Sequence, residues 1–257
     1  MLHHIPFWAL SALMQLHAHP IPVTDRPPAY VVRYDCTFNE HFDRDRLERH
    51  YFAELRMQGD SSYFFLTPDD SWPPEPDAPN ATTYLMDTLL RVVKARDVGM
   101  LVFGEPFLKG KDQFFADSLF PMHWEPIEGQ RQVGDRICKG ARAFFKGRTY
   151  ICWYSTEIPI PEGPWKLGGL PGLILEAYDE QDDLHFTLRN IEPVAGILLS
   201  EPRGMHDDPG DYETYRESWR DIARHIEEGM TDPGSPDCLS CQSHSKIKFY
   251  LWEKPLD

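Results

Sequence analysis

Short runs in which apolar and polar residues alternate are the feature that most restricts the fold of this chain. The clearest run covers residues 184–191. Its alternate positions are apolar (Leu184, Phe186, Leu188) and polar (His185, Thr187, Arg189). Side chains of a strand point alternately to the two faces of a sheet, so this run predicts a strand with one buried and one wet face, as is typical of antiparallel sheets.

Turn residues join these runs into hairpins. Residues 173–178 and 184–191 flank the acidic turn 179–183, and residues 131–145 and 148–158 meet at Lys146-Gly147. Both pairs are predicted β-hairpins. The apolar run at 173–175 has no polar face, which indicates a central strand covered on both sides.

Four more strands are predicted outside this region. Residues 30–38 alternate, and residues 52–57 and 63–66 lie on either side of the turn residues Gly59-Asp60. The last strand covers residues 246–252. The 23 prolines of the chain also favour short elements over long helical bundles.

Two segments have helical spacing. Apolar residues recur every three or four positions over 83–97 and over 211–230, and Asp211 is a suitable N-cap for the second. We therefore predict an α+β, mainly β fold: a curved antiparallel meander sheet with one or two helices packed on one face. No linker divides the chain, so residues 19–257 are expected to form a single β-rich domain.

The charge of the chain restricts its partners. Lys and Arg number 26 against 41 Asp and Glu, a net charge of −15. Binding to a phosphate backbone or an anionic membrane needs clustered basic residues, so neither nucleic acid nor an anionic membrane surface is an expected partner.

The first residues resemble a secretory signal. Residues 5–16 are apolar but too short to cross a bilayer, and the small residue Ala18 follows them. We expect residues 1–18 to be a signal peptide and the protein to be periplasmic or secreted, although the segment before the apolar run lacks Lys and Arg. No other stretch has transmembrane length.

The five cysteines leave several alternatives open. In the hairpin that pairs Phe145 with Arg148, Cys152 lies opposite Ala141, so the sulfur of Cys138 points to the other face and a Cys138–Cys152 disulfide is not expected. Cys238 and Cys241 are the better candidates for a disulfide. With His244 they could instead supply three ligands of a zinc site, or remain free thiols. No cofactor is expected, with zinc as the lesser alternative.

One segment, residues 163–176, is unlike the rest. Gly168-Gly169 permit positive φ or a close approach of the backbone, and Pro171 restricts both itself and Leu170. This segment is either a corner that seats a loop on the core or a ligand-facing loop. In the second case Trp165 stacks on a ring or peptide, while Lys166 or Arg148 meets an acid.

The same segment carries a family resemblance. Residues 169–174 read Gly169-Leu170-Pro171-Gly172-Leu173-Ile174, the motif for which the GLPGLI family is named. The surroundings at Trp124, at Cys138 within residues 134–141, and at 153–160 are also similar to that family. The resemblance covers about residues 120–195 and implies an exported Bacteroidota protein with one β-rich domain. It implies no activity, since members are mostly of unknown function.

Three functions are consistent with these observations. The first is an exported, envelope-associated, non-catalytic protein that binds an apolar or peptide-like ligand, or a protein partner, in the concavity of the sheet near Trp165, Lys166, Trp153 and Arg148. The second is a metal- or redox-linked protein using Cys238, Cys241 and His244. The third is a hydrolase-like enzyme whose site is assembled only by folding. The sequence contains no Gly-x-Ser-x-Gly, His-Glu-x-x-His or phosphate-loop motif, which favours a non-catalytic protein.

Overall fold

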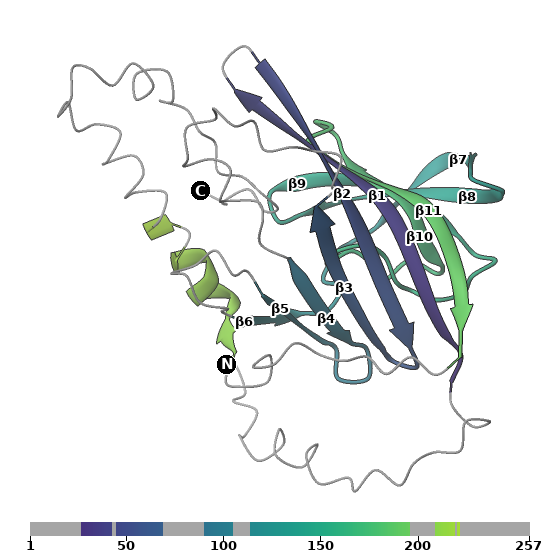
Figure 1. The fold of residues 1–257 in the computed structure, drawn as a ribbon, viewed down its shortest axis with the longest axis horizontal. Coiled ribbons are helices and arrows are strands. Elements are labelled where there is room, and N and C mark those ends of the chain that lie inside the picture. Colours follow the sequence, from purple (N-terminus) through teal and green to yellow (C-terminus); the bar gives the residue numbers. More distant parts are fainter. Residues whose placement is uncertain are drawn as a thin grey trace, which may run out of the picture.

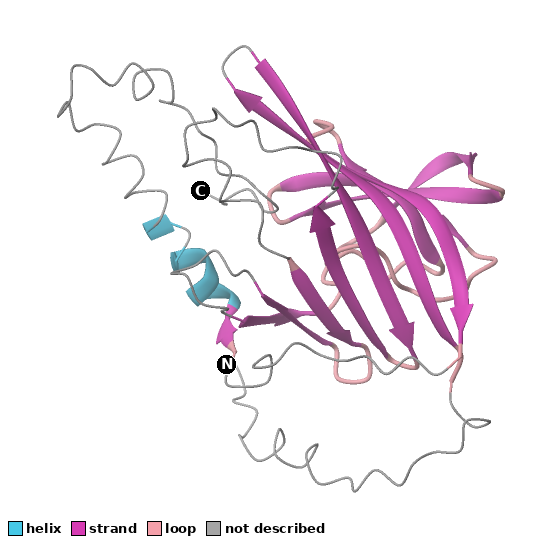
Figure 2. Cartoon of the chain, viewed as in Figure 1, coloured by secondary structure: helices cyan, strands magenta, loops and turns pink. Residues whose placement is uncertain are grey.

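The computed structural model describes residues 27–42, 45–68, 90–104, 114–195, 209–218 and 220–221. The strands are β1 (Ala29–Phe42), β2 (Asp45–Gln58), β3 (Ser61–Pro68), β4 (Arg91–Ala95), β5 (Met100–Gly104), β6 (Phe114–Ser118), β7 (Glu125–Val133), β8 (Arg136–Phe145), β9 (Arg148–Ser155), β10 (Leu173–Asp179), β11 (Leu184–Val194) and β12 (Gly210–Asp211). They form one sheet in the order β12-β6-β5-β4-β3-β2-β1-β11-β10-β9-β8-β7. The described part of the chain is thus mainly β, as predicted, and Figure 2 shows strands dominating it.

The predicted hairpins are confirmed. Phe145 pairs with Arg148 and Ala141 with Cys152, the register that the Lys146-Gly147 turn predicts. Both turn residues have positive φ, 51° at Lys146 and 77° at Gly147, as a tight hairpin turn requires. The runs 30–38, 52–57, 63–66, 173–178 and 184–191 lie in β1, β2, β3, β10 and β11. The sheet is antiparallel except where β12 pairs in parallel with β6.

Two predicted elements are wrong. Residues 91–95 form strand β4 rather than the end of a helix over 83–97, and residues 83–89 of that predicted helix lie outside the described part. The two β-branched residues Val92 and Val93 favour a strand, and pairing with both β3 and β5 outweighs the helical spacing. The single strand expected at 131–145 is divided into β7 and β8, because Gly134, with φ 61°, makes a turn between them.

The helix predicted at 211–230 is present where the structure describes it, at 212–218 and 220–221, and is here called the Tyr212 helix. Asp211 caps it as predicted, since its Oδ1 accepts the backbone N–H of Thr214 at 2.8 Å. Figure 1 shows this helix beside β6, at the opposite end of the sheet from the β7–β8 hairpin. The rest of the predicted helix and the strand at 246–252 lie outside the described residues.

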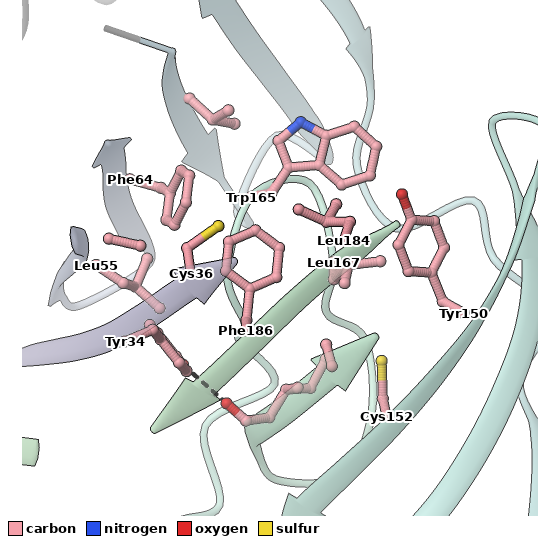
Figure 3. Packing of buried hydrophobic residues seen from close by; sticks show 14 of the residues in the cluster. Tyr34, Cys36, Leu55, Phe64, Tyr150, Cys152, Trp165, Leu167, Leu184 and Phe186 are labelled. Carbon is pink, nitrogen blue, oxygen red and sulfur yellow. Dashed lines mark hydrogen bonds between the residues drawn. The ribbon is translucent and has the colours of Figure 1, made fainter. Parts of the chain in front are cut away.

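The core lies against one face of the sheet, here called the inner face. Cross-strand pairing places Phe103, Phe64, Cys36, Phe186 and Cys152 on this face, each in a different strand. The loop 156–172, between β9 and β10, lies on it and contributes Trp165 and Leu167 to the core. Figure 3 shows these two side chains among residues of β1, β9 and β11. Tyr34 also crosses the core and donates its hydroxyl to the Ile174 carbonyl at 2.7 Å.

Candidate functional site

The GLPGLI motif ends a loop that is folded tightly onto itself. The N–H of Gly169 donates to the Pro161 carbonyl at 3.0 Å, and the N–H of Ile174 donates to the Glu162 carbonyl at 2.9 Å. A Cβ on Gly172 would collide with the carbonyl oxygen of Ser155, so this glycine is required for close approach of the backbone. The motif therefore seats the loop on the core, which is the first of the two roles predicted for it.

Trp165 and Lys166, which follow the first turn of this loop, are buried in the core. Trp165 is 0% exposed and lies 5.7 Å from the Phe145 ring and 5.8 Å from the Tyr150 ring. The Lys166 ammonium is 3.3 Å from the centre of the Phe103 ring, and the Tyr212 helix covers it with two tyrosine rings. The negative faces of these rings stabilise the buried cation.

A buried ion pair fastens the loop to β4. The Lys94 ammonium donates to Glu162 Oε2 at 3.0 Å and to the carbonyls of Gly163 and Leu167 at 2.8 and 2.9 Å. Arg96 donates to the other oxygen of Glu162 at 2.6 Å. Burial lowers the pKa of Lys94, and the charge of Glu162 offsets part of this effect. The Lys94–Glu162 pair is thus a clasp between the sheet and the loop.

Arg148 is engaged by two carboxylates. Its Nη1 donates to Asp179 Oδ2 at 2.5 Å and to Asp183 Oδ2 at 2.8 Å. Burial lowers the pKa of Arg148, but Tyr150 and the two aspartates raise it by more, so the net pKa lies above its ordinary value. Asp183, in the acidic turn between β10 and β11, is thereby held against an arginine that lies in the core.

The four predicted ligand-binding residues do not form one site. Trp165, Lys166 and Arg148 are at most 1% exposed and lie on the inner face. Trp153 follows the buried Cys152 in β9, so its side chain points to the opposite, outer face. The structure thus separates Trp153 from the other three, and it is the one of the four that is partly accessible to solvent.

Trp153 belongs to a polar cluster on the outer face. Its cross-strand partner in β10 is Glu176, whose side chain is only 5% exposed. Glu176 Oε1 lies 3.1 Å from Arg131 Nη2 and 3.0 Å from His185 Nε2. The guanidinium of Arg131 is 5.6 Å from the centre of the Trp153 ring. We call these four residues the outer cluster.

Two groups in the outer cluster have unused hydrogen-bonding capacity. The buried indole N–H of Trp153 donates to no residue in the described part of the chain. Arg131 and the His185 ring both contact the same oxygen of Glu176, Oε1, and no residue in the described ranges bonds to its Oε2. The indole N–H of Trp153 is thus a buried donor that has no partner among the described residues, in the strand next to that of Glu176.

Three residues of the outer cluster, Glu176, Arg131 and His185, are not among the site residues predicted from the sequence. The alternation at 184–191 assigns His185 to the polar face, but nothing in the sequence pairs it with Glu176 or Arg131 from two other strands. The sequence contains one signal for Glu176, because it is a carboxylate directly after the apolar run 173–175 of a predicted central strand. Such a residue requires either a buried partner or a functional reason.

The described cysteines are reduced and buried. Cys36, Cys138 and Cys152 are free thiols, in agreement with the expectation that Cys138 and Cys152 do not pair. Burial raises the pKa of Cys138 to about 11. Cys238, Cys241 and His244 lie outside the described residues, so their disulfide and zinc alternatives stay predictions. Within the described ranges, no three His, Cys, Asp or Glu residues come together as metal ligands.

The family resemblance is confirmed by a family model. The model, described as a protein of unknown function (Porph_ging), matches residues 122–176 and corresponds to the GLPGLI-type family of exported Bacteroidota proteins. The matched segment contains the loop, its motif and strands β7 to β9. No curated protein matches the chain. In the described part, no helix is long and apolar enough to cross a membrane.

Several solved structures show a weak similarity. A structure of PNGF-II is 14% identical with a TM-score of 0.49, and the match covers 75% of this chain and 33% of that one. An outer membrane lipoprotein-sorting protein domain from Vibrio parahaemolyticus is 7% identical, with a TM-score of 0.29 and coverages of 66% and 87%. A DUF1329 family protein from Desulfovibrio piger is 10% identical, with a TM-score of 0.24 and coverages of 74% and 93%. The chain spans a third of the length of the PNGF-II structure.

Proposed function

We propose that this is an exported, non-catalytic binding protein of the cell envelope, located in the periplasm or secreted, and that the outer cluster is its binding surface. The observation that carries the proposal is the buried indole N–H of Trp153, which has no partner among the described residues and belongs to the same cluster as Glu176, Arg131 and His185. Buried polar groups in native proteins are nearly always hydrogen-bonded, so this unpaired donor suits a ligand that accepts a hydrogen bond from it.

The inner core, on the opposite face of the sheet, holds the strands that carry this surface in place. Trp165, Lys166 and Arg148 belong to the inner core, where they hold the loop 156–172 and the β10–β11 turn against the sheet. Strands β9, β10 and β11 carry Trp153, Glu176 and His185, so a rigid inner core keeps these three side chains at fixed separations. Sites on regular strands are better preorganised than sites on loops.

Export is supported by the apolar segment 5–16 and by the family that matches residues 122–176. The partner is a small molecule, a peptide or an envelope protein. Nucleic acid is not a suitable partner for a chain of net charge −15.

Intact mass spectrometry of the protein purified from the exported fraction tests the proposal. The denatured mass should correspond to the chain without residues 1–18. The native mass should carry an adduct that is absent from the Trp153→Phe variant, which keeps the ring and loses the donor. Trp124→Phe is the matched control, because Trp124 already donates to the Gly168 carbonyl at 2.9 Å and should keep the adduct. An uncleaved chain, or an adduct that survives Trp153→Phe, would contradict the proposal.

A further inference from the structure

The outer face of the sheet carries large apolar side chains that reach solvent. Phe144 of β8 is 65% exposed and Phe52 of β2 is 37% exposed. Ile151 and Tyr178, which are cross-strand partners in β9 and β10, are partly exposed. The residues on either side of these four in their strands are buried, so alternation places all four on the outer face. The solvent face of an antiparallel sheet is expected to be polar, so these apolar side chains indicate a docking surface.

The charges of this face cancel one another. Five arginines pair with five carboxylates of the same face at distances from 2.7 to 3.5 Å: Arg33 with Glu54 and Glu192, Arg56 with Glu54, Arg131 with Glu176, Arg142 with Glu125, and Arg189 with Asp35. Taking these residues from the 26 basic and 41 acidic residues of the chain leaves its whole net charge of −15 on the remainder. Two copies of the chain therefore repel each other least when they approach through this face.

The composition of the outer face matches that of an interface between proteins. Such interfaces are enriched in aromatic residues and arginine and depleted in lysine. Arginines of this face lie beside its aromatic rings, with Arg189 4.8 Å from the centre of the Phe52 ring and Arg131 5.6 Å from that of Trp153. The four described lysines lie on the inner side instead: Lys94, Lys139, Lys146 and Lys166.

A face with exposed apolar residues and equal numbers of opposite charges is complementary to a copy of itself. In a two-fold symmetric dimer both subunits use the same patch, so the arginines of one copy can meet the carboxylates of the other. A strongly acidic partner would oppose the five carboxylates with like charge, and a strongly basic partner would do the same to the five arginines. The charge pattern therefore favours a second copy of the chain over either kind of partner.

The outer face is also large enough for a stable dimer. The seven strands from β2 to β7 in the sheet order are about 29 Å across at a spacing of about 4.8 Å. A strand of 10 residues such as β8 is about 33 Å long. Each subunit of a stable dimer buries about 800 Å², which such a face can supply.

We infer that the partner that binds the outer face is a second copy of this chain, in a two-fold symmetric dimer with Phe144 in the contact. This inference rests on the proposed function, since it names the partner of the face that carries the outer cluster. The arginine–carboxylate pairs surround the apolar residues, as the polar rim of an interface surrounds its core.

Sedimentation velocity of the protein purified from the exported fraction tests this inference. Over protein concentrations from about 1 to 100 μM, we expect the unchanged protein to reach twice the mass of one chain. Phe144→Asp places a charge in the apolar part of the contact in both copies at once. We expect it to weaken the dimer about thirtyfold or more, as is typical of a central interface residue.

Ile137→Asp is the matched control. Ile137 lies in the same strand as Phe144 and is 52% exposed, but an odd number of positions separates the two residues, so Ile137 points to the other face. This variant adds the same charge to the same strand and should leave the dimer intact. Circular dichroism verifies that both variants are folded. Should Phe144→Asp fail to fold, Phe144→Ser provides the same test with a smaller change.

The outcomes distinguish this inference from the proposed function. A dimer that Phe144→Asp dissociates and Ile137→Asp does not supports the inference. If Ile137→Asp weakens the dimer as much as Phe144→Asp, the contact is on another face and the inference is overturned. A monomer at about 100 μM that carries a smaller adduct, lost in Trp153→Phe, overturns the inference and leaves the proposed function standing. A monomer without an adduct overturns both.

Discussion

The clasp between Lys94 and Glu162 gives the sharpest prediction for stability. Lys94→Met keeps the length of the apolar stem but removes an ammonium that makes three bonds, to a carboxylate and two carbonyls. Glu162, whose side chain is 0% exposed, then keeps only the partly exposed Arg96 as its cation. Removing one partner of a buried ion pair costs about 3–5 kcal/mol, and because Arg96 remains we expect about 3 kcal/mol.

Urea unfolding followed by circular dichroism at pH 7 measures this loss. With a dependence on urea of about 3 kcal/mol per molar, the midpoint should fall by about 1 M. The control is the double variant Lys94→Met with Glu162→Gln, in which no carboxylate is left uncompensated. It should recover more than half of the loss, since the cost lies in the unpaired charge rather than in the missing bonds. A loss below about 1 kcal/mol in the single variant, or equal losses in both, would refute this reasoning.

Three further predictions concern the inner core. Arg148→Met should cost about 3–5 kcal/mol, because it leaves the buried Asp179 without its cation, and the same urea experiment measures it; an unchanged midpoint would contradict the assigned pair. Gly172→Ala should cost about 3 kcal/mol, because the added methyl group collides with the Ser155 backbone. Gly134→Ala is the control and should cost about 1 kcal/mol, because Gly134 has a φ of 61° but lies in open space. Equal urea midpoints for the two variants would disprove the close approach at Gly172. Burial raises the pKa of Cys36 above the ordinary thiol value of 9.0, so its contribution to stability is complete below pH 9 and is lost as the pH rises above it. In Cys36→Ala, the unfolding free energy should therefore fall less steeply between pH 9 and 10.5 than in the unchanged protein, by up to about 1.4 kcal/mol per pH unit. Identical slopes in the two proteins would argue against a protonated buried thiol.

The sequence alone determined the local pairing of the strands. Alternation at 184–191 and the Lys146-Gly147 turn were sufficient to predict the β8–β9 and β10–β11 hairpins, including the pair Ala141–Cys152. The Asp211 cap also followed from the sequence. These features depend on residues close together in the chain, whose turn geometry and side-chain period fix the register without further contacts.

Secondary structure became uncertain where pairing between distant residues decided it. Residues 91–95 have helical spacing, and they form β4 because β3 and β5 provide ladders on both sides. The charged side chains show the same dependence. Lys94 and Asp179 resemble solvated residues in the sequence, and they are buried because Glu162 and Arg148 reach them from segments 68 and 31 residues away.

The location of the candidate site was decided only by the tertiary structure. Alternation states which residues share a face, but not which face becomes covered. The loop 156–172 folds back over the inner face and encloses Trp165 and Lys166 in the core, while Trp153, from the strand just before this loop, stays on the solvent side. Glu176, Arg131 and His185 then meet Trp153 because their strands β10, β7, β11 and β9 belong to a run of five consecutive strands that also includes β8, and no spacing in the sequence encodes this neighbourhood.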